Sequence, residues 1–290
     1  MTLRHLKIFA TVCKENSITL AAKKLYISQP AVSAAIKELE IFYGSPLFDR
    51  ISKKLYLTEA GKTVYQYAIH ITSLFDELEE NIKNQTSETG SIKIGSSITI
   101  GTHLITEYIQ KFSKQHPNVK PYVTIDSSDV IEHMILNNEL DFGLIEGFVH
   151  SGDIISHEFI HDELIVICSP QNPLIYKDNL NISDLSNQNF LMREKNSGTR
   201  ELAESILSLN GISLHPLWES SSTEAIINGV SGDIGISILP LQLTAEYLKQ
   251  KKVMRLNVNN VNFDRQYHII YHKNKYLSPA VAAFIKLCHS

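Results

Sequence analysis

A row of apolar residues with heptad spacing lies between residues 64 and 82. Its members are separated by 4, 3, 4, 3 and 4 positions: Val64, Ala68, Ile71, Phe75, Leu78 and Ile82. This spacing predicts one amphipathic helix over residues 59–87, capped by Thr58 and roughly 42 Å long at about 1.5 Å per residue. The N-terminal segment is too short to cover such a helix, so we expect these six residues to pair with a second copy of the chain. Packing against the same chain is the alternative.

Charge is unevenly distributed on the two sides of this predicted helix. The 290 residues have a net charge of -4, yet residues 1–57 hold nine Lys/Arg against four Asp/Glu. The net charge is therefore +5 in this head, -3 over residues 58–87 and -6 in the remainder. A basic head is what attraction to nucleic-acid phosphates requires, although a small domain can also have a basic face by chance. Charged residues at the N-terminus and the lack of an apolar run of about 18 residues predict a cytoplasmic protein with no membrane partner.

The basic head has the pattern of three helices followed by a hairpin. Apolar residues recur at helical spacing over residues 3–15, and a short second helix follows from Ser17. Ser28 can cap a third helix, Pro30 suits its first turn, and Gly44 ends it. Alternating residues 47–50 and 55–57 around a basic tip predict two short strands.

Two helices joined by a tight turn, followed by a hairpin, are typical of a winged helix-turn-helix. Gln29 could read a base edge in the major groove, whereas Ser33 and Lys37 lie further along the helix and face the phosphates. The predicted DNA-binding residues are Ser28, Gln29, Pro30, Ser33, Lys37, Arg50, Lys53 and Lys54. The alternative is a three-helix cluster with an incidental basic surface.

Strands alternate with helices in the remainder of the chain. Residues 92–95, 119–125 and 140–145 are predicted strands, and residues 103–115 and 130–137 are predicted helices. A second lobe repeats this pattern with strands at 189–192 and 234–238 and a helix ending at Leu209. Such alternation predicts parallel sheets covered by helices, in two lobes that close on a ligand. Ser97 and Thr99 lie where a strand leads into a helix, so hydroxyl and backbone N–H groups could bind a small anion there.

The head carries the residues of a known signature, which spans residues 1 to about 65 almost without gaps. It comprises Ala21-Ala22, Leu25, Ser28-Gln29-Pro30-Ala31-Val32-Ser33, Ile36-Lys37-Glu38-Leu39-Glu40, Gly44, Leu47-Phe48-Asp49-Arg50 and Leu57-Thr58-Glu59-Ala60-Gly61. With these residues the chain resembles the LysR-type transcriptional regulators. The resemblance implies an α/β protein with a winged helix-turn-helix, a dimerising linker helix and a two-lobed domain similar to periplasmic solute-binding proteins, assembled as a homodimer or homotetramer.

Two segments of the C-terminal part extend this resemblance. Residues 140–147 and 197–200 look like the subgroup that includes cysteine-biosynthesis and carbon-fixation regulators. Residue-by-residue matching implies effector contacts, or positions near the effector, at Ser97, Thr99, Ser128, Glu146, Thr199 and Thr223. Ile98 and Lys195-Asn196 depart from the subgroup pattern, which leaves the effector's identity open.

The expected organisation is a DNA-binding domain at 1–58, a dimerising linker helix at 59–87 and an effector-binding domain at 91–290. The expected function is regulation of transcription by binding of double-stranded promoter DNA, controlled by a small anionic effector, with RNA polymerase as a further partner. No cofactor or metal and no catalytic residue is expected. A solute receptor whose head only dimerises it, and an enzyme on the two-lobed scaffold, are the competing classes.

One segment matches a zinc-protease motif. Residues 157–161 have the sequence H-E-x-x-H, in which both imidazoles must share one helical face to bind zinc. The flanking residues 154–169 predict an extended strand instead. Positions four apart on a strand are about 13 Å from each other at 3.3 Å per residue, so we expect no shared metal ion.

Overall fold

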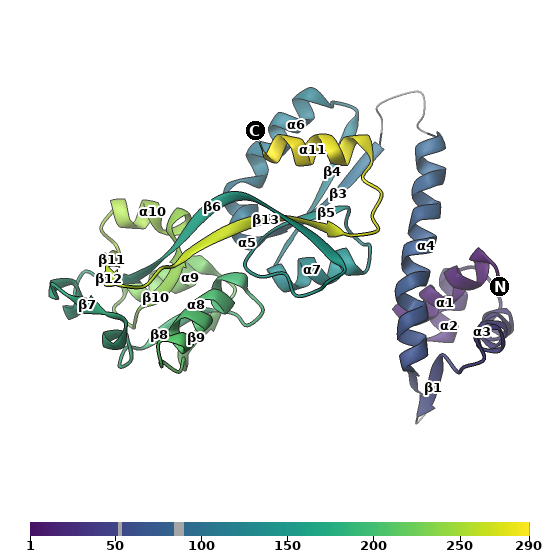
Figure 1. Ribbon diagram of the computed structural model, residues 1–290, viewed down its shortest axis with the longest axis horizontal. Coiled ribbons are helices and arrows are strands. Elements are labelled where there is room, and N and C mark those ends of the chain that lie inside the picture. The colour runs from purple at the N-terminus through teal and green to yellow at the C-terminus, as the bar shows by residue number, and fades with distance from the viewer. Residues whose placement is uncertain (52–53, 84–89, 290) are drawn as a thin grey trace. The chain divides into compact units, whose positions relative to one another are not determined.

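The structure is a computed structural model that describes residues 1–51, 54–83 and 90–289. The chain forms two units (Figure 1). The N-terminal unit comprises Met1–Gly90 with the short segments Leu136–Glu139 and Asn274–Tyr276, and the body contains Ser91–Ile135, Leu140–Lys273 and Leu277–Ser290. Each unit is described by itself.

The N-terminal unit contains the three helices predicted from the sequence: α1 (Leu3–Glu15), α2 (Ile18–Lys24) and α3 (Gln29–Tyr43). The Ser17 hydroxyl caps α2 by accepting the N–H of Leu20 at 3.2 Å. Gly44 ends α3 in the left-handed conformation, with φ of 64°. The helices enclose one apolar core that includes Phe9, Val12, Val32 and Leu39, all without exposed surface.

The predicted hairpin follows as β1 (Phe48–Ile51) and β2 (Lys54–Leu57), paired antiparallel with Phe48 opposite Leu57. The carboxylate of Glu40 on α3 accepts the N–H of Leu47 at 2.9 Å, which ties the hairpin to the third helix. Thr58 caps the next helix by accepting the N–H of Gly61 at 2.9 Å, as predicted. A Cβ at Gly61 would lie 2.1 Å from the Leu47 carbonyl oxygen, so this close approach requires glycine.

Helix α4 (Glu59–Lys83) carries the heptad row, and the structure divides that row in two. Ala68 has no exposed surface, and Val64 packs against the same N-terminal core. Ile71, Phe75 and Leu78 are 44%, 39% and 53% exposed. The first part of the row therefore packs within its own chain, as in the alternative stated for the sequence. In the later part Ile71 and Leu78 are exposed, Lys7 lies 5.5 Å over the Phe75 ring, and the side chain of Ile82 is outside the described part of the structure.

Seven strands form the main sheet of the body. They are β3 (Gly90–Ser97), β4 (Val119–Asp126), β5 (Phe142–Glu146), β6 (Ile154–Cys168), β10 (Ser237–Pro240), β11 (Met254–Leu256) and β13 (Asp264–His272). The order is β10-β6-β13-β5-β3-β4, with β11 also paired to β6. β3 and β5 are parallel, but β13 and β6 run antiparallel to their neighbours. The sheet is thus mixed, and the prediction of parallel sheets is wrong for the strands that cross between the lobes.

Helices cover this framework in both lobes. The first lobe has α5 (Ile98–His103), α6 (Ile105–Gln115), α7 (Ser128–Leu136) and the C-terminal α11 (Pro279–Cys288). The second has α8 (Gly198–Leu209), α9 (Thr223–Ser231) and α10 (Leu241–Lys249), with the parallel strands β8 (Phe190–Arg193) and β9 (Pro216–Ser220). Short elements complete it: β7 (Leu180–Asn181), β12 (Val258–Asn259) and two 3-10 turns, Pro173–Tyr176 and Ile182–Leu185. The helix expected at 103–115 is divided at Leu104, and the strand expected at 234–238 begins only at Ser237.

The long strand β6 joins the two lobes. Its residues 154–163 pair with β13, and residues 164–168 pair with β10 and β11. Figure 1 shows β6 and β13 running together from one lobe to the other. The H-E-x-x-H segment lies on β6, so the predicted strand is confirmed. His157 Nε2 lies 3.1 Å from the Tyr271 hydroxyl and His161 Nε2 lies 3.8 Å from Asp264, so the two imidazoles face different partners.

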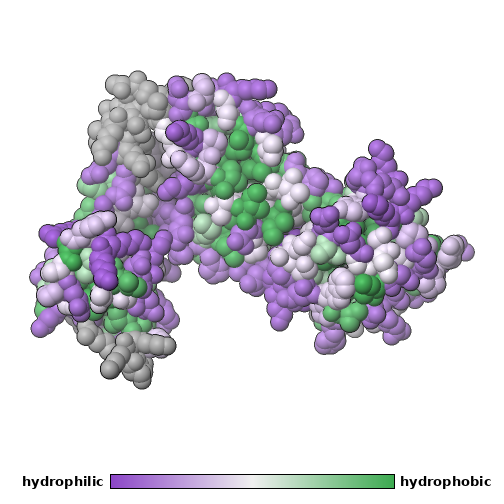
Figure 2. Space-filling view, turned by 180° about the vertical axis from the view of Figure 1, so that it is seen from behind, coloured by the Kyte–Doolittle hydropathy of each residue, from purple (hydrophilic) through white to green (hydrophobic). Residues whose placement is uncertain are grey.

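The surface of the body includes exposed apolar side chains. Tyr122, Val123 and Ile125 on β4 are 58%, 37% and 49% exposed. Figure 2 shows a hydrophobic area on one face of the body. None of the helices in the described part of the chain combines the length and the apolar run needed to cross a bilayer.

Candidate functional site

The N-terminal end of α3 presents polar side chains to solvent. The Ser28 hydroxyl accepts the N–H of Ala31 at 3.3 Å, and Pro30 lies in the first turn, as predicted. Gln29 and Lys37 are exposed, whereas Ser33 is half-buried. The opposite face of α3 packs into the core, so the first turns of the helix present these polar side chains to a partner.

The hairpin follows α3 but is described only in part. Arg50 and Lys54 lie on β1 and β2, and their side chains are outside the described part of the structure. Lys53 lies outside the described residues altogether. The helix and hairpin of a winged helix-turn-helix are therefore present, while the predicted contacts of these three basic residues remain predictions.

Four of the six predicted effector residues lie together in the first lobe, where three hydroxyl residues surround Glu146 at the end of β5. Ser97, at the end of β3, donates its hydroxyl hydrogen to Glu146 Oε2. Thr99 on α5 donates to Oε1 at 3.0 Å, and Ser128 on α7 donates to the backbone carbonyl of Glu146 at 2.9 Å. All four residues are buried, with Glu146 2% exposed. Ser97 is not used as a cap of α5; its hydroxyl is turned to an acid of the chain itself.

Thr199, the fifth predicted residue, is joined to this group by an arginine that the sequence reasoning missed. Arg265 on β13 donates from Nη1 to Thr199 Oγ1 at 2.9 Å, and this nitrogen is 3.9 Å from Glu146 Oε1. Its Nε donates to Asp162 on β6 at 2.6 Å. The sequence pattern that could have revealed Arg265 is the alternation along β13, because it places this charged residue on the same face as the buried Tyr267 and Ile269. We name Ser97, Thr99, Glu146, Thr199 and Arg265 the Glu146 cluster.

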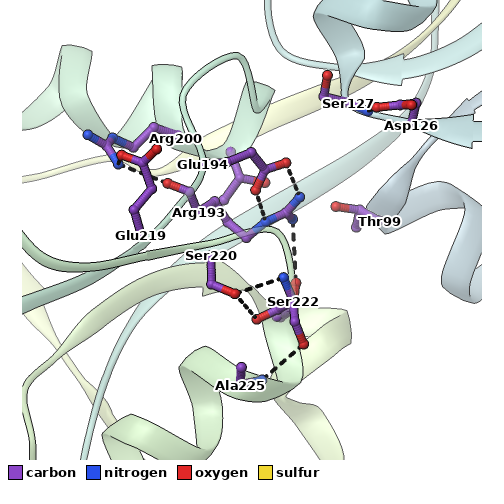
Figure 3. Close-up of polar contacts among 12 residues, drawn as sticks. Thr99, Asp126, Ser127, Arg193, Glu194, Arg200, Glu219, Ser220, Ser222 and Ala225 are labelled. Carbon is purple, nitrogen blue, oxygen red and sulfur yellow. Dashed lines mark hydrogen bonds and ion pairs between the residues drawn. The ribbon is translucent and has the colours of Figure 1, made fainter.

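The sixth residue, Thr223, contacts a second buried arginine. Arg193, at the end of β8, donates to Thr223 Oγ1 at 3.4 Å and forms a bidentate pair with Glu194, both bonds 2.8 Å. In Figure 3 the side chain of Thr99 points toward this guanidinium from the other lobe. Arg193 was also not predicted from the sequence, because the residues around an arginine at a strand end do not show whether it is buried or exposed. A bidentate guanidinium suits a carboxylate or phosphate group.

The backbones of the two lobes touch beside the Glu146 cluster. A Cβ at Gly198, the first residue of α8, would lie 2.3 Å from the Glu146 carbonyl oxygen. Gly147 has φ of 93°, and a Cβ there would lie 3.0 Å from the Gly198 Cα. Both positions therefore require glycine, and the contact holds the start of α8 against the end of β5.

His150 forms a second link between the lobes. Its Nε2 lies 2.8 Å from Glu201 on α8, and its Nδ1 lies 3.1 Å from the nearly buried Glu132 on α7. The hydrogen bond with Glu201, followed by that with Glu132, raises the pKa of His150 above its usual 6.5. The protonated imidazolium can donate to both carboxylates at once.

Comparison with known proteins identifies the family. Residues 3–62 match "Bacterial regulatory helix-turn-helix protein, lysR family", and residues 85–290 match "LysR substrate binding domain". The chain belongs to the LysR family. CmpR of Synechocystis sp., an HTH-type transcriptional activator, is 33% identical over 285 residues, which cover 98% of this chain and 93% of that protein.

Solved structures of LysR-type proteins have the same fold. Full-length CbnR, solved in complex with its target DNA, has a TM-score of 0.63 at 19% identity and covers 99% of both chains. The regulatory domain of CcmR from Synechocystis, solved with 2-PG, has a TM-score of 0.64 at 23% identity, over 69% of this chain and 96% of that one. This LysR-type protein is therefore a DNA-binding transcription regulator with an effector-binding domain, and not an enzyme.

Proposed function

We propose that this regulator reads promoter DNA with the exposed polar end of α3. Gln29 contacts a base edge, Ser28, Pro30, Ser33 and Lys37 lie along the groove and its phosphates, and the hairpin residues Arg50, Lys53 and Lys54 contact the backbone. The observation that supports this most is that Gln29 and Lys37 are exposed on a helix whose other face is packed in the core. The solved complex of CbnR with its target DNA concerns a protein of the same fold.

The test is a comparison of Gln29→Ala with Glu38→Gln in gel-shift titrations of the protein's own upstream DNA. Loss of a bidentate base contact weakens specific binding by about 1–3 kcal/mol, or roughly fivefold to 150-fold. Glu38→Gln removes an exposed charge from the same helix and should not weaken binding. Unchanged affinity of Gln29→Ala, with the fold intact by circular dichroism, would contradict the assignment.

We propose further that the protein acts in the cytoplasm as a homodimer or homotetramer. The exposed part of the heptad row on α4 supports pairing through this helix, and the apolar side chains of β4 offer a second surface. Two heads would then read two half-sites of one operator. The proposed boundaries are 1–58 for the DNA-binding domain, 59–87 for the linker helix and 91–290 for the effector-binding domain. RNA polymerase as a further partner rests on the family alone.

We propose that a small molecule controls this activity by binding between the lobes, at Ser97, Thr99, Ser128, Glu146, Thr199 and Thr223. The grouping of Ser97, Thr99 and Ser128 around Glu146 supports this proposal, with two hydroxyls on its carboxylate and one on its backbone carbonyl. Ligand binding would change the packing of the lobes and hence the spacing of the heads on DNA. A saturating ligand that left both the DNA footprint and the bend angle unaltered would contradict this coupling.

A further inference from the structure

The Glu146 cluster has a hydrogen-bond polarity opposite to that expected from its sequence. Ser and Thr hydroxyls at this place were expected to donate to an anion. In the structure, Ser97 and Thr99 both donate to the Glu146 carboxylate, one to each oxygen. The hydroxyl hydrogens of Ser97 and Thr99 are therefore already bonded to Glu146, an acidic residue of the chain itself.

This arrangement determines what the hydroxyls can offer to a ligand. A hydroxyl has one hydrogen and two lone pairs, and an ionised carboxylate only accepts. Because the hydrogens of Ser97 and Thr99 point to Glu146, the remaining lone pairs of all three groups are acceptors. The first-lobe side of the site therefore suits a ligand group that carries a hydrogen.

Arg265 supplies the opposite polarity within the same cluster. Its Nη1 is 3.9 Å from Glu146 Oε1, and the arginine side chain is only 2% exposed. Nε and Nη1 have partners, whereas the buried Nη2 has no hydrogen-bond partner within the part of the chain that the structure describes. Buried donors are nearly always paired, so this nitrogen indicates a group that is to be bound.

We propose that the effector presents an oxygen acid that keeps one hydrogen, such as a hydrogen phosphate group. Its O–H donates to Glu146, and its charged oxygen accepts from Arg265 Nη2. A fully deprotonated oxyanion has no hydrogen to give, so its oxygens would face the Glu146 carboxylate with no hydrogen bond between them. Because the hydroxyls of the cluster are buried, the ligand reaches them when the lobes separate and is enclosed when they close. This inference rests on the proposed function of the site between the lobes.

Inorganic phosphate and sulfate are the probes, because they match in size and differ in the retained proton. Calorimetric titrations of the full-length protein at neutral pH and constant ionic strength compare the two. We expect phosphate to bind at least about tenfold more tightly than sulfate, since a site built around a hydrogen bond rejects the analogue that lacks it. In Glu146→Gln the amide offers a donor without charge, so the preference should fall to about twofold or less. Glu158→Gln, an exposed position on β6, should keep the wild-type preference.

Equal binding of sulfate by the wild type, failure to bind phosphate at millimolar concentration, or a tenfold preference retained in Glu146→Gln would each overturn the proposal. The wild-type comparison needs no variant, so it decides the matter even if Glu146→Gln does not fold. Failure of the proposed function has another signature. In that case phosphate would bind selectively, while the DNA footprint and bend would not respond to it.

Discussion

Gly198→Ala should loosen the contact between the two lobes. The new Cβ would lie 2.3 Å from the Glu146 carbonyl oxygen and 3.2 Å from the Ser128 hydroxyl oxygen, where ordinary contacts are 3.4–4 Å. The first of these atoms is backbone and cannot rotate away. The start of α8 must therefore move from β5 by about 1 Å, as close packing transmits such an overlap. The same carbonyl accepts the hydrogen bond of Ser128, which we expect to weaken as well.

The magnitude follows from two opposing effects. Overpacking of this kind costs about 1–3 kcal/mol, and the rigid backbone contact favours the upper half of that range. Replacing a glycine that has an ordinary φ by alanine also stabilises the protein by about 0.4–1 kcal/mol, because it lowers the conformational entropy of the unfolded chain. The net loss in free energy of unfolding is then about 1–2.5 kcal/mol. At about 2–4 °C per kcal/mol for a domain of this size, the Tm should fall by roughly 2–10 °C.

Tryptophan fluorescence is a suitable assay, because the chain has a single tryptophan, Trp218 on β9 of the body. Its thermal transition reports the body alone. Gly152→Ala is the matched control, since a Cβ there meets no atom within 4 Å. We expect the control to retain the wild-type Tm or exceed it slightly. A Gly198→Ala protein as stable as the control would refute the inference that the lobes are held by this backbone contact.

Two further predictions concern the link at His150 and the linker helix. The pKa of His150 is raised in the fold, so its stabilisation is complete below the unfolded value of 6.5 and is lost as pH rises through the higher folded value. In urea unfolding, the free energy of unfolding of the body should therefore fall as the pH is raised from acidic to mildly alkaline. His150→Gln lacks the charge that pairs with Glu132 and Glu201, so its free energy of unfolding should depend less on pH. The same pH dependence in the variant and the wild type would contradict this role of His150. On α4, Leu78→Glu places a charge on the exposed part of the heptad row. The dissociation constant of the assembly, measured by sedimentation equilibrium, should rise tenfold or more, which corresponds to about 1.4 kcal/mol. Gln66→Glu, exposed but off the row, should leave assembly unchanged, and equal behaviour of the two variants would argue against pairing through this seam.

The Glu146 cluster shows how far sequence reasoning reaches at a site. A strand-to-helix junction and the family resemblance both predict Ser97 and Thr99, the resemblance alone predicts Ser128, and the structure brings the three together around Glu146. Glu146 is implied by the same resemblance, but its hydrogen bond with Ser97 could not be predicted, because the two residues are 49 positions apart and meet only through the parallel pairing of β3 and β5. Arg265 is 66 residues from Thr199 and reaches it only because β13 passes from one lobe to the other.

The sequence by itself determined the helices of the head, the hairpin and the extended strand that excludes a zinc site, because periodicity and caps such as Ser28 and Gly44 act over a few residues. Tertiary structure decided how those elements are used. It packed Ala68 into the chain's own core while Ile71 and Leu78 stayed exposed, and it turned two hydroxyls toward an internal carboxylate. The physical reason is that the hydrophobic pattern of a helix is the same whichever surface covers it, and a hydroxyl donates to whichever acceptor the packing of distant strands brings near.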